Sequence, residues 1–361
     1  MCHNAYFCDI RYKENNYRLH KLSCAMKKII FAALVLLSIA PAGAQMTEQL
    51  TATLRQGDNT TVFYGKDAFK SAYEAAESGA EITLSSGAFN NPGRIITSNI
   101  SIYCQGYLND ETTGIAKTSV LDDFLIGTAE AEAEPTENIY MEGIWMNGSL
   151  YLSENGVKNI QVVKCRTGNA QFFADAENVV FRQMYFTGSI HARGFTIAGL
   201  LVQNSYLPNG FQKFSSSSSV MADHCCVFIR DYYNDRSAVT MSNCITWGAN
   251  SCVGSVFYNC SLEEGELADR TYVNCYNGVS AGSLFSDQEN INWDDARTWE
   301  LKDPTTYMGN DGTQIGMLGG QYPFEKIPGV PRIIKSEVDG ATNAEGQLHL
   351  NIQAEARPVN E

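Results

Sequence analysis

The residues best suited to chemistry lie in a short stretch that reads Arg-Asp-Tyr-Tyr-Asn-Asp-Arg, residues 230 to 236. Adjacent Tyr232 and Tyr233 offer aromatic faces that stack on the C–H surface of a sugar ring, while their charged neighbours suit hydroxyls or a uronate. If the earlier loops around residues 191 and 213 project on the same side, all three form one groove wall; ordinary loop packing is the alternative. The candidate binding residues are therefore Arg193, Lys213, Arg230, Asp231, Tyr232, Tyr233 and Arg236.

Three residues are candidates for catalysis, namely Arg182, His191 and Asp223. Arg182 and Asp223 occupy the same position in repeats that lie two apart, which separates them by about 10 Å in a stack of strands. That distance suits a sugar ring held between them, with Arg182, His191 or Lys213 as proton abstractor. A solvated strand face that carries charge produces the same pattern, so the sequence leaves turnover open.

These residues belong to a repeat of about 20 residues. Copies read Val-Gln-Asn-Ser at 202–205 and Met-Ser-Asn-Cys at 241–244, and the last residue of each copy is its anchor. Apolar residues alternate before the anchor, as at Ile160 and Val162, which is the period of a strand with one buried face. The anchors fall at residues 144, 165, 184, 205, 225, 244, 260 and 275. Their uneven spacing predicts stacked coils joined by loops of variable length rather than a helical repeat.

A polar residue precedes the anchor in seven of these repeats, and it is most often asparagine. Asparagine tolerates the left-handed backbone and can bond its own main chain, so this position predicts a bend between two strands. Stacked at the strand spacing of about 4.8 Å, such side chains would also bond one another from coil to coil. The sequence therefore predicts a parallel solenoid with an internal asparagine ladder.

This pattern resembles the right-handed parallel β-helix proteins of the pectate-lyase-like superfamily. The resemblance includes Asp67–Ala76, whose helical apolar spacing matches a helix that closes the first coil, and residues 311–334, which are similar to the end of secreted β-helix proteins of Bacteroidetes-type bacteria. It implies an all-β fold: a right-handed parallel β-helix with an N-terminal capping helix and a C-terminal β-hairpin that pairs residues 333–338 with 348–356. The superfamily contains lyases, hydrolases, adhesins and inert scaffolds, so the fold does not settle the function.

The cysteines and acidic residues give weaker signals. Five cysteines, at 165, 225, 244, 260 and 275, occupy the anchor position and are expected to be small core residues. Cys226 and Cys252 lie off this column and are the better candidates for a disulfide.

His224 lies in the column of polar bend residues and has no zinc-like ligand spacing, so no metal site is predicted there. Calcium is the one cofactor that the sequence suggests, at the acidic turn from Asp287 to Asp295, with a solvated turn as the alternative.

Residues 26–44 have the three parts of a cleaved export signal: Met-Lys-Lys, an apolar run, and Ala-Gly-Ala. The run is too short to span a bilayer, so we expect no membrane insertion after cleavage. Residues 1–25 are interpreted as an upstream extension from a misassigned start. We then expect a β-helix with its cap over 45–286, and an irregular tail with a hairpin over 287–361. The expected location is secreted, periplasmic or in the cell envelope.

The composition limits the partners. With 26 Lys and Arg against 40 Asp and Glu, the net charge of −14 lacks the basic footprint of a nucleic-acid binder. Two hypotheses remain for what we expect to be a monomer. In the first, an exported β-helix contacts polysaccharide through its loop face and, if it is an enzyme, acts as a polysaccharide lyase or glycoside hydrolase. In the second, it is a non-catalytic surface or envelope scaffold or adhesin.

Overall fold

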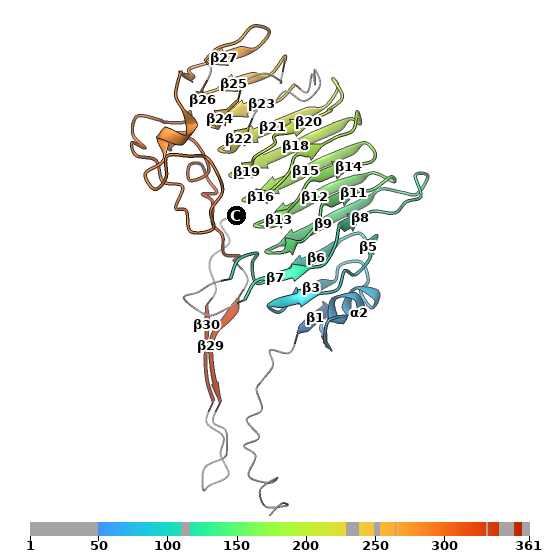
Figure 1. Ribbon diagram of the computed structural model, residues 1–361. Helices are drawn as coiled ribbons and strands as arrows, with labels where there is room; N and C mark the ends of the chain where they lie inside the picture. Colours follow the sequence, from blue (N-terminus) through green and yellow to red (C-terminus); the bar gives the residue numbers. More distant parts are fainter. Residues whose placement is uncertain are drawn as a thin grey trace, which may run out of the picture. The chain divides into compact units, whose positions relative to one another are not determined.

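The computed structural model describes residues 50–109, 116–228, 238–248, 253–263, 265–329, 331–338 and 350–355. They form a nearly all-β parallel solenoid in which successive coils contribute strands to three sheets, here called A, B and C (Figure 1). The fold class predicted from the repeat is confirmed, and the handedness of the coil stays a prediction. None of the helices in these residues is long and apolar enough to span a membrane.

Sheet A has twelve strands and is parallel except at its first end, where β1 pairs antiparallel with both β2 and β3. Its strands are β1 (Thr51–Gln56), β2 (Asn59–Tyr64), β3 (Glu81–Leu84), β6 (Ile100–Tyr103), β9 (Thr136–Glu142), β12 (Val157–Val163), β15 (Ala176–Arg182), β18 (Ile197–Gln203), β21 (Ser219–Asp223), β23 (Thr240–Ser242), β25 (Val256–Tyr258) and β27 (Thr271–Val273).

Sheets B and C complete each coil with shorter strands. Sheet B contains β4 (Gly87–Phe89), β7 (Thr118–Val120), β10 (Trp145–Met146), β13 (Arg166–Thr167), β16 (Tyr185–Phe186), β19 (Tyr206–Leu207), β22 (Cys226–Phe228), β24 (Ile245–Trp247), β26 (Ser261–Leu262) and β28 (Tyr276–Asn277). Sheet C contains β5 (Arg94–Ile95), β8 (Phe124–Ile126), β11 (Leu150–Leu152), β14 (Ala170–Phe172), β17 (Ile190–His191) and β20 (Phe211–Gln212).

The core lies inside the coils and follows the alternation read from the sequence. Ile160, Val179 and Leu200 are paired in register on three neighbouring strands of sheet A, and all three are buried. Phe181 on the same face is also fully buried. Equivalent positions therefore stack on one another, and each coil buries its apolar face only because its neighbours are present.

The bend between sheets A and B is also as predicted. Seven polar residues there have a left-handed backbone, at φ between 46° and 55°: Lys164, Gln183, Asn204, His224, Asn243, Asn259 and Asn274. The anchor cysteines that follow are free, and all are buried except half-buried Cys275. Burial raises the pKa of the Cys165 thiol to about 12, which keeps it protonated and unreactive. Cys226 is likewise free and buried, and its predicted partner Cys252 lies outside the described residues.

The asparagine ladder is present, but the predicted column was wrong. Asn138 Nδ2 donates to Asn99 Oδ1 at 2.7 Å, Asn159 to Asn138 at 2.9 Å, and Asn178 to Asn159 at 3.1 Å. These side chains lie on the outward face of sheet A, each at a left-handed residue, which for Asn99 is just before its strand and for the other three is the third residue of the strand. The polar residues at the bend between sheets A and B instead contact a distant segment of the chain, described below. They are Lys164, Gln183, Asn204, His224 and Asn243.

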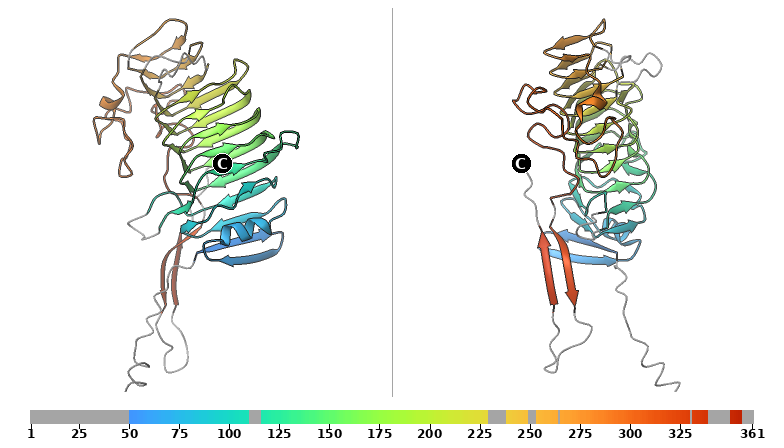
Figure 2. Two further views of the ribbon diagram at one scale, coloured as in Figure 1. Left: turned by 45° about the vertical axis from the view of Figure 1, so that its right-hand side comes forward. Right: turned by 60° about the vertical axis from the view of Figure 1, so that its left-hand side comes forward.

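Helix α2 (Ala68–Glu74) and the segment after the last coil pack against this solenoid. The helix buries Phe69, which stacks on Phe124 with ring centroids 6.3 Å apart. After the last coil, the 3-10 helix η1 (Ala281–Leu284) begins a tail that covers part of the outer face of sheet B, shown in orange in Figure 2. Strands β29 (Arg332–Val338) and β30 (Leu350–Glu355) form a separate antiparallel pair over the segments expected to make a hairpin.

Candidate functional site

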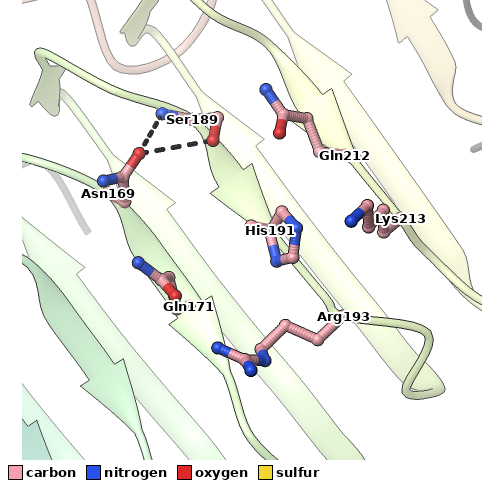
Figure 3. Close-up of a pocket in the computed structure, with 7 residues that line it drawn as sticks. All are labelled: Asn169, Gln171, Ser189, His191, Arg193, Gln212 and Lys213. Carbon is pink, nitrogen blue, oxygen red and sulfur yellow. Dashed lines mark hydrogen bonds between the residues drawn. The ribbon is translucent and has the colours of Figure 1, made fainter. Parts of the chain in front are cut away.

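A groove with a volume of about 510 Å³ lies on the outer face of sheet C. Its lining is entirely polar and comes from three neighbouring coils (Figure 3). The lining residues are Asn169, Gln171, Ser189, His191, Arg193, Gln212 and Lys213. Three of these side chains are basic, in a protein whose net charge is −14.

The centre of this groove is formed by the outward-facing residues of three strands of sheet C. Ala170, Ile190 and Phe211 point inward and are buried. The next residue of each strand therefore points outward. Gln171 pairs with His191, and His191 pairs with Gln212, so the three side chains stack at the strand spacing of about 4.8 Å. The groove thus runs across successive coils.

The residues that follow the strands supply two cations, Arg193 and Lys213. Arg193 and Lys213 each follow a strand of sheet C and have a left-handed backbone, with φ of 57° and 50°. Such a conformation is costly for residues with long side chains, and it concentrates at functional positions in proteins. The guanidinium carbon of Arg193 lies 4.5 Å from the centre of the Phe173 ring, which fixes its direction.

An amide and a hydroxyl fix the opposite end of the groove. Asn169 Oδ1 accepts hydrogen bonds from the backbone N–H of Ser189 at 2.9 Å and from its hydroxyl at 3.3 Å. Asn169 Nδ2 in turn lies 3.4 Å from Ser149 Oγ in the preceding coil. This chain of polar contacts holds the Asn169 and Ser189 side chains in place beside the cations.

Two aromatic residues continue the same face toward the N-terminal coils. Tyr151 is paired in register with Gln171, and its ring packs edge-on against Phe173 at 5.5 Å between centroids. Both rings are half-buried, so part of each remains accessible. Aromatic faces next to hydrogen-bonding groups and cations are the features that a sugar site combines.

The structure brings together only part of the predicted site. His191, Arg193 and Lys213 converge in the groove, as expected for neighbouring loops that project on one side. The candidates Arg230, Asp231, Tyr232, Tyr233 and Arg236 lie outside the described residues. The polar groups of Asn169, Gln171 and Ser189 were not predicted, whereas Gln212 belongs to the expected loop around residue 213. Their signal was a polar residue on either side of buried Ala170 and Ile190, which is weak in strands of two or three residues.

Arg182 and Asp223 do not form the sugar cradle that was proposed for them. Gln203 lies between them in register, and its Oε1 accepts a hydrogen bond from Arg182 Nε at 3.2 Å. The guanidinium also lies 3.8 Å from the centre of the Tyr322 ring. Asp223 accepts a hydrogen bond from Asn243 at 3.0 Å and contacts His224. Both residues therefore belong to a structural contact on sheet A, away from the groove.

The acidic turn proposed for calcium is engaged in protein contacts. Asp287 accepts hydrogen bonds from the buried guanidinium of Arg297 at 3.1 Å and from the backbone N–H of Thr298 at 2.9 Å. Burial opposes the charged form, but these bonds outweigh it and lower the pKa of Asp287. Among the described residues, no group of three His, Cys, Asp or Glu side chains is arranged to hold a metal ion.

Comparisons with known protein families, with curated proteins and with solved structures found no match to this chain.

Proposed function

We propose that this protein binds an acidic polysaccharide in the groove on sheet C. The observation that carries the proposal is the convergence of His191, Arg193 and Lys213 in one polar groove of a strongly acidic protein. Cations gathered at one place on such a surface favour carboxylate or sulfate groups, because they offer charge-assisted hydrogen bonds. The amides and hydroxyls between them suit sugar hydroxyls.

The rest of the sheet C face supports a polymer rather than a small anion. Phe173 lies beside Arg193 and Tyr151 lies on the coil before the groove, so the two rings extend the surface by one coil, where a sugar ring could stack. The parallel solenoid agrees with membership of the pectate-lyase-like superfamily, and the residues 26–44 agree with export to the cell envelope or beyond. We propose both, together with an origin in Bacteroidetes-type bacteria.

Cleavage of the bound polysaccharide would be a second activity of the same groove. If the protein is a lyase, His191 or Lys213, which both line the groove, would be the base that abstracts a proton from a bound uronate. Incubation with acidic polysaccharides, with and without calcium, tests this step. Ultraviolet-absorbing unsaturated products would show a lyase, and new reducing ends without such absorbance would show a hydrolase.

Affinity electrophoresis and calorimetry with acidic polysaccharides test the binding itself. We expect Arg193→Ala to weaken binding by roughly 10- to 150-fold, because a hydrogen bond to a charged group contributes roughly 1.5 to 3 kcal/mol. Lys158→Ala is the matched control, since it removes an exposed cation from sheet A, where it pairs with Glu177 at 3.1 Å. We expect this control to bind like the unchanged protein.

A neutral glycan of similar length separates charge recognition from general sugar contact. Its affinity should change little in Arg193→Ala. Equal losses in Arg193→Ala and Lys158→Ala would contradict a site in the groove. Absence of binding across a broad panel would overturn the proposal in favour of a scaffold or adhesin.

A further inference from the structure

A segment of the tail, residues 310–325 and here called the strap, lies along the bend between sheets A and B. One bend residue from each of five successive coils contacts it, and the order along the strap is reversed. The contacts are Asn243 with Asn310, His224 with Asp311 and Thr313, Asn204 with the carbonyls of Met317 and Gly319, Gln183 with the carbonyls of Tyr322 and Pro323, and Lys164 with Glu325. The side chains of these bend residues therefore bind the strap and do not form a ladder with one another.

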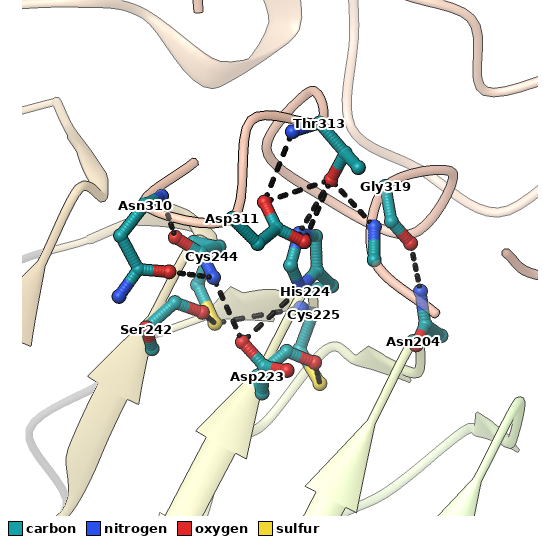
Figure 4. A network of polar contacts seen from close by, with 12 residues as sticks. Asn204, Asp223, His224, Cys225, Ser242, Cys244, Asn310, Asp311, Thr313 and Gly319 are labelled. Carbon is teal, nitrogen blue, oxygen red and sulfur yellow. Dashed lines mark hydrogen bonds and ion pairs between the residues drawn. The ribbon is translucent and has the colours of Figure 1, made fainter. Parts of the chain in front are cut away.

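His224 is the centre of this contact (Figure 4). Its side chain is only 1% exposed, and both ring nitrogens face the oxygen atoms of other groups. Nδ1 lies 3.1 Å from Asp223 Oδ1 on its own coil. Nε2 lies 3.1 Å from Thr313 Oγ1 and 3.5 Å from Asp311 Oδ2 on the strap. One imidazole thus links a carboxylate of the solenoid to a carboxylate of the strap.

The strap fits closely around this ring. A Cβ atom at Gly319 would come within 2.5 Å of His224 Cδ2, and one at Gly320 within 2.9 Å of Nδ1. Gly320 also has a φ of 75°, which other residues rarely adopt, and its N–H donates to Thr313 Oγ1 at 2.6 Å. The strap is therefore shaped to the imidazole, and the contact depends on which nitrogens carry a proton.

The hydrogen-bond donors around His224 determine which protonation state of its ring fits these contacts. Thr313 Oγ1 carries a single hydrogen, and this oxygen lies 3.0 Å from both Oδ1 and Oδ2 of Asp311. With that hydrogen donated to Asp311, Nε2 must donate to Thr313 while Nδ1 donates to Asp223, which requires the charged imidazolium. A neutral ring leaves one nitrogen without a hydrogen, so either Thr313 turns away from Asp311 or the contact with Asp223 is lost.

We propose that the strap is a pH-sensitive latch, held on the solenoid by protonated His224 between Asp223 and Asp311 and loosened when this imidazole loses its proton. The ionisable groups around the ring are these two carboxylates and the Cys244 thiol of the neighbouring coil. Burial would lower the pKa of His224, but the hydrogen bond to Asp223 and the charges of Asp223 and Asp311 outweigh it, so the pKa is raised.

The direction of the pH effect follows from this raised pKa. Docking is strongest below the ordinary histidine pKa of about 6.5, where the ring is charged in both states. It weakens as the pH rises through the higher pKa of the docked state. Acidification should therefore close the latch, and mildly alkaline conditions should open it.

Amide hydrogen exchange of the whole chain measures this directly. The N–H of Gly316 donates to the carbonyl of Asn243, and that of Gly320 to Thr313, so both report strap docking. We expect their protection factors to fall several-fold between about pH 5.5 and about pH 8.5. The N–H of Leu150, which donates to the carbonyl of Asn169 on sheet C away from the strap, is the internal control and should not change. Constant protection of Gly316 and Gly320 across this range would overturn the proposal.

Two variants identify the group that titrates. His224→Asn keeps a residue suited to the left-handed bend and should abolish the pH dependence, whereas His191→Asn, in the groove, should retain it. A pH dependence that survives His224→Asn would overturn the proposal. If His224→Asn does not fold, Asp311→Asn on the strap replaces it, with the NMR titration of the His224 ring as readout. That ring should titrate at a lower pH in Asp311→Asn, and an unchanged midpoint would likewise refute the latch.

Discussion

At the bend between sheets A and B, buried thiols accept the backbone N–H of the anchor residue one coil earlier. Cys244 Sγ accepts from Cys225 at 3.4 Å, and Cys260 Sγ accepts from Cys244 at the same distance. Ser205 does the same for Met184, with its oxygen at 3.0 Å. Each of these side chains also donates to the carbonyl two residues before it. The repeated cysteine is therefore a small hydrogen-bonding residue as well as an apolar one.

This role predicts an order of stability among substitutions of Cys244. Cys244→Ser retains an acceptor and a donor, as Ser205 shows in the same column. Cys244→Val has a similar size but leaves the N–H of Cys225 buried without that acceptor, which costs about 1 to 3 kcal/mol. We therefore expect Cys244→Val to be the less stable variant, measured as the midpoint of urea unfolding at equal m value. A valine variant as stable as the serine variant would contradict the hydrogen-bonding role.

At the scale of one element, the outward ladder on sheet A couples backbone shape to side-chain bonds. Asn159 has a φ of 54° and bonds to Asn138 on one side and Asn178 on the other. In the coil after Asn178, Gly199 holds the equivalent position at φ 86°. Asparagine and glycine are the residues that accept this conformation at low cost, which explains why the column changes from one to the other.

Paired substitutions separate the two contributions. Asn159→Gly removes the hydrogen bonds of the ladder, but glycine adopts the left-handed conformation at low cost. Asn159→Ala removes the same bonds and adds the free-energy cost of holding alanine in that conformation. We expect the alanine variant to be less stable than the glycine variant by about 1 kcal/mol. Thermal unfolding of both variants checks this difference. A glycine variant equal to or less stable than the alanine variant would show that the conformation is not strained there.

The elements also show what sequence can and cannot predict. The repeat predicted the alternation of sheet A and the left-handed bend at residues such as Asn204, because both follow from local residue types. The strap was beyond such reasoning. His224 and Thr313 are 89 residues apart and share no period, so the ring was read as one member of a ladder. The groove was half predicted, since its cations are conspicuous while Gln171 and Ser189 are ordinary strand and loop residues.

At the scale of the whole molecule, charge acts differently far from the groove and within it. The net charge of −14 repels an acidic polymer at long range, while Arg193 and Lys213 attract it at contact. Salt screens the long-range repulsion first, because the Debye length falls from about 30 Å at 0.01 M to about 10 Å at 0.1 M. The two rate constants of binding should therefore respond to salt for different reasons.

We expect the association rate constant for an acidic polysaccharide to rise between about 0.01 M and about 0.1 M salt, because screening relieves repulsion by the whole protein. The dissociation rate constant should rise as well, because salt weakens the contacts with the groove cations. Surface plasmon resonance with immobilised polysaccharide measures both. In Arg193→Ala the salt effect on dissociation should shrink while that on association persists, since one cation hardly alters a charge of −14. An association rate that falls with salt would show instead that the groove itself steers the polymer, and that the acidic remainder of the protein has little influence on the encounter.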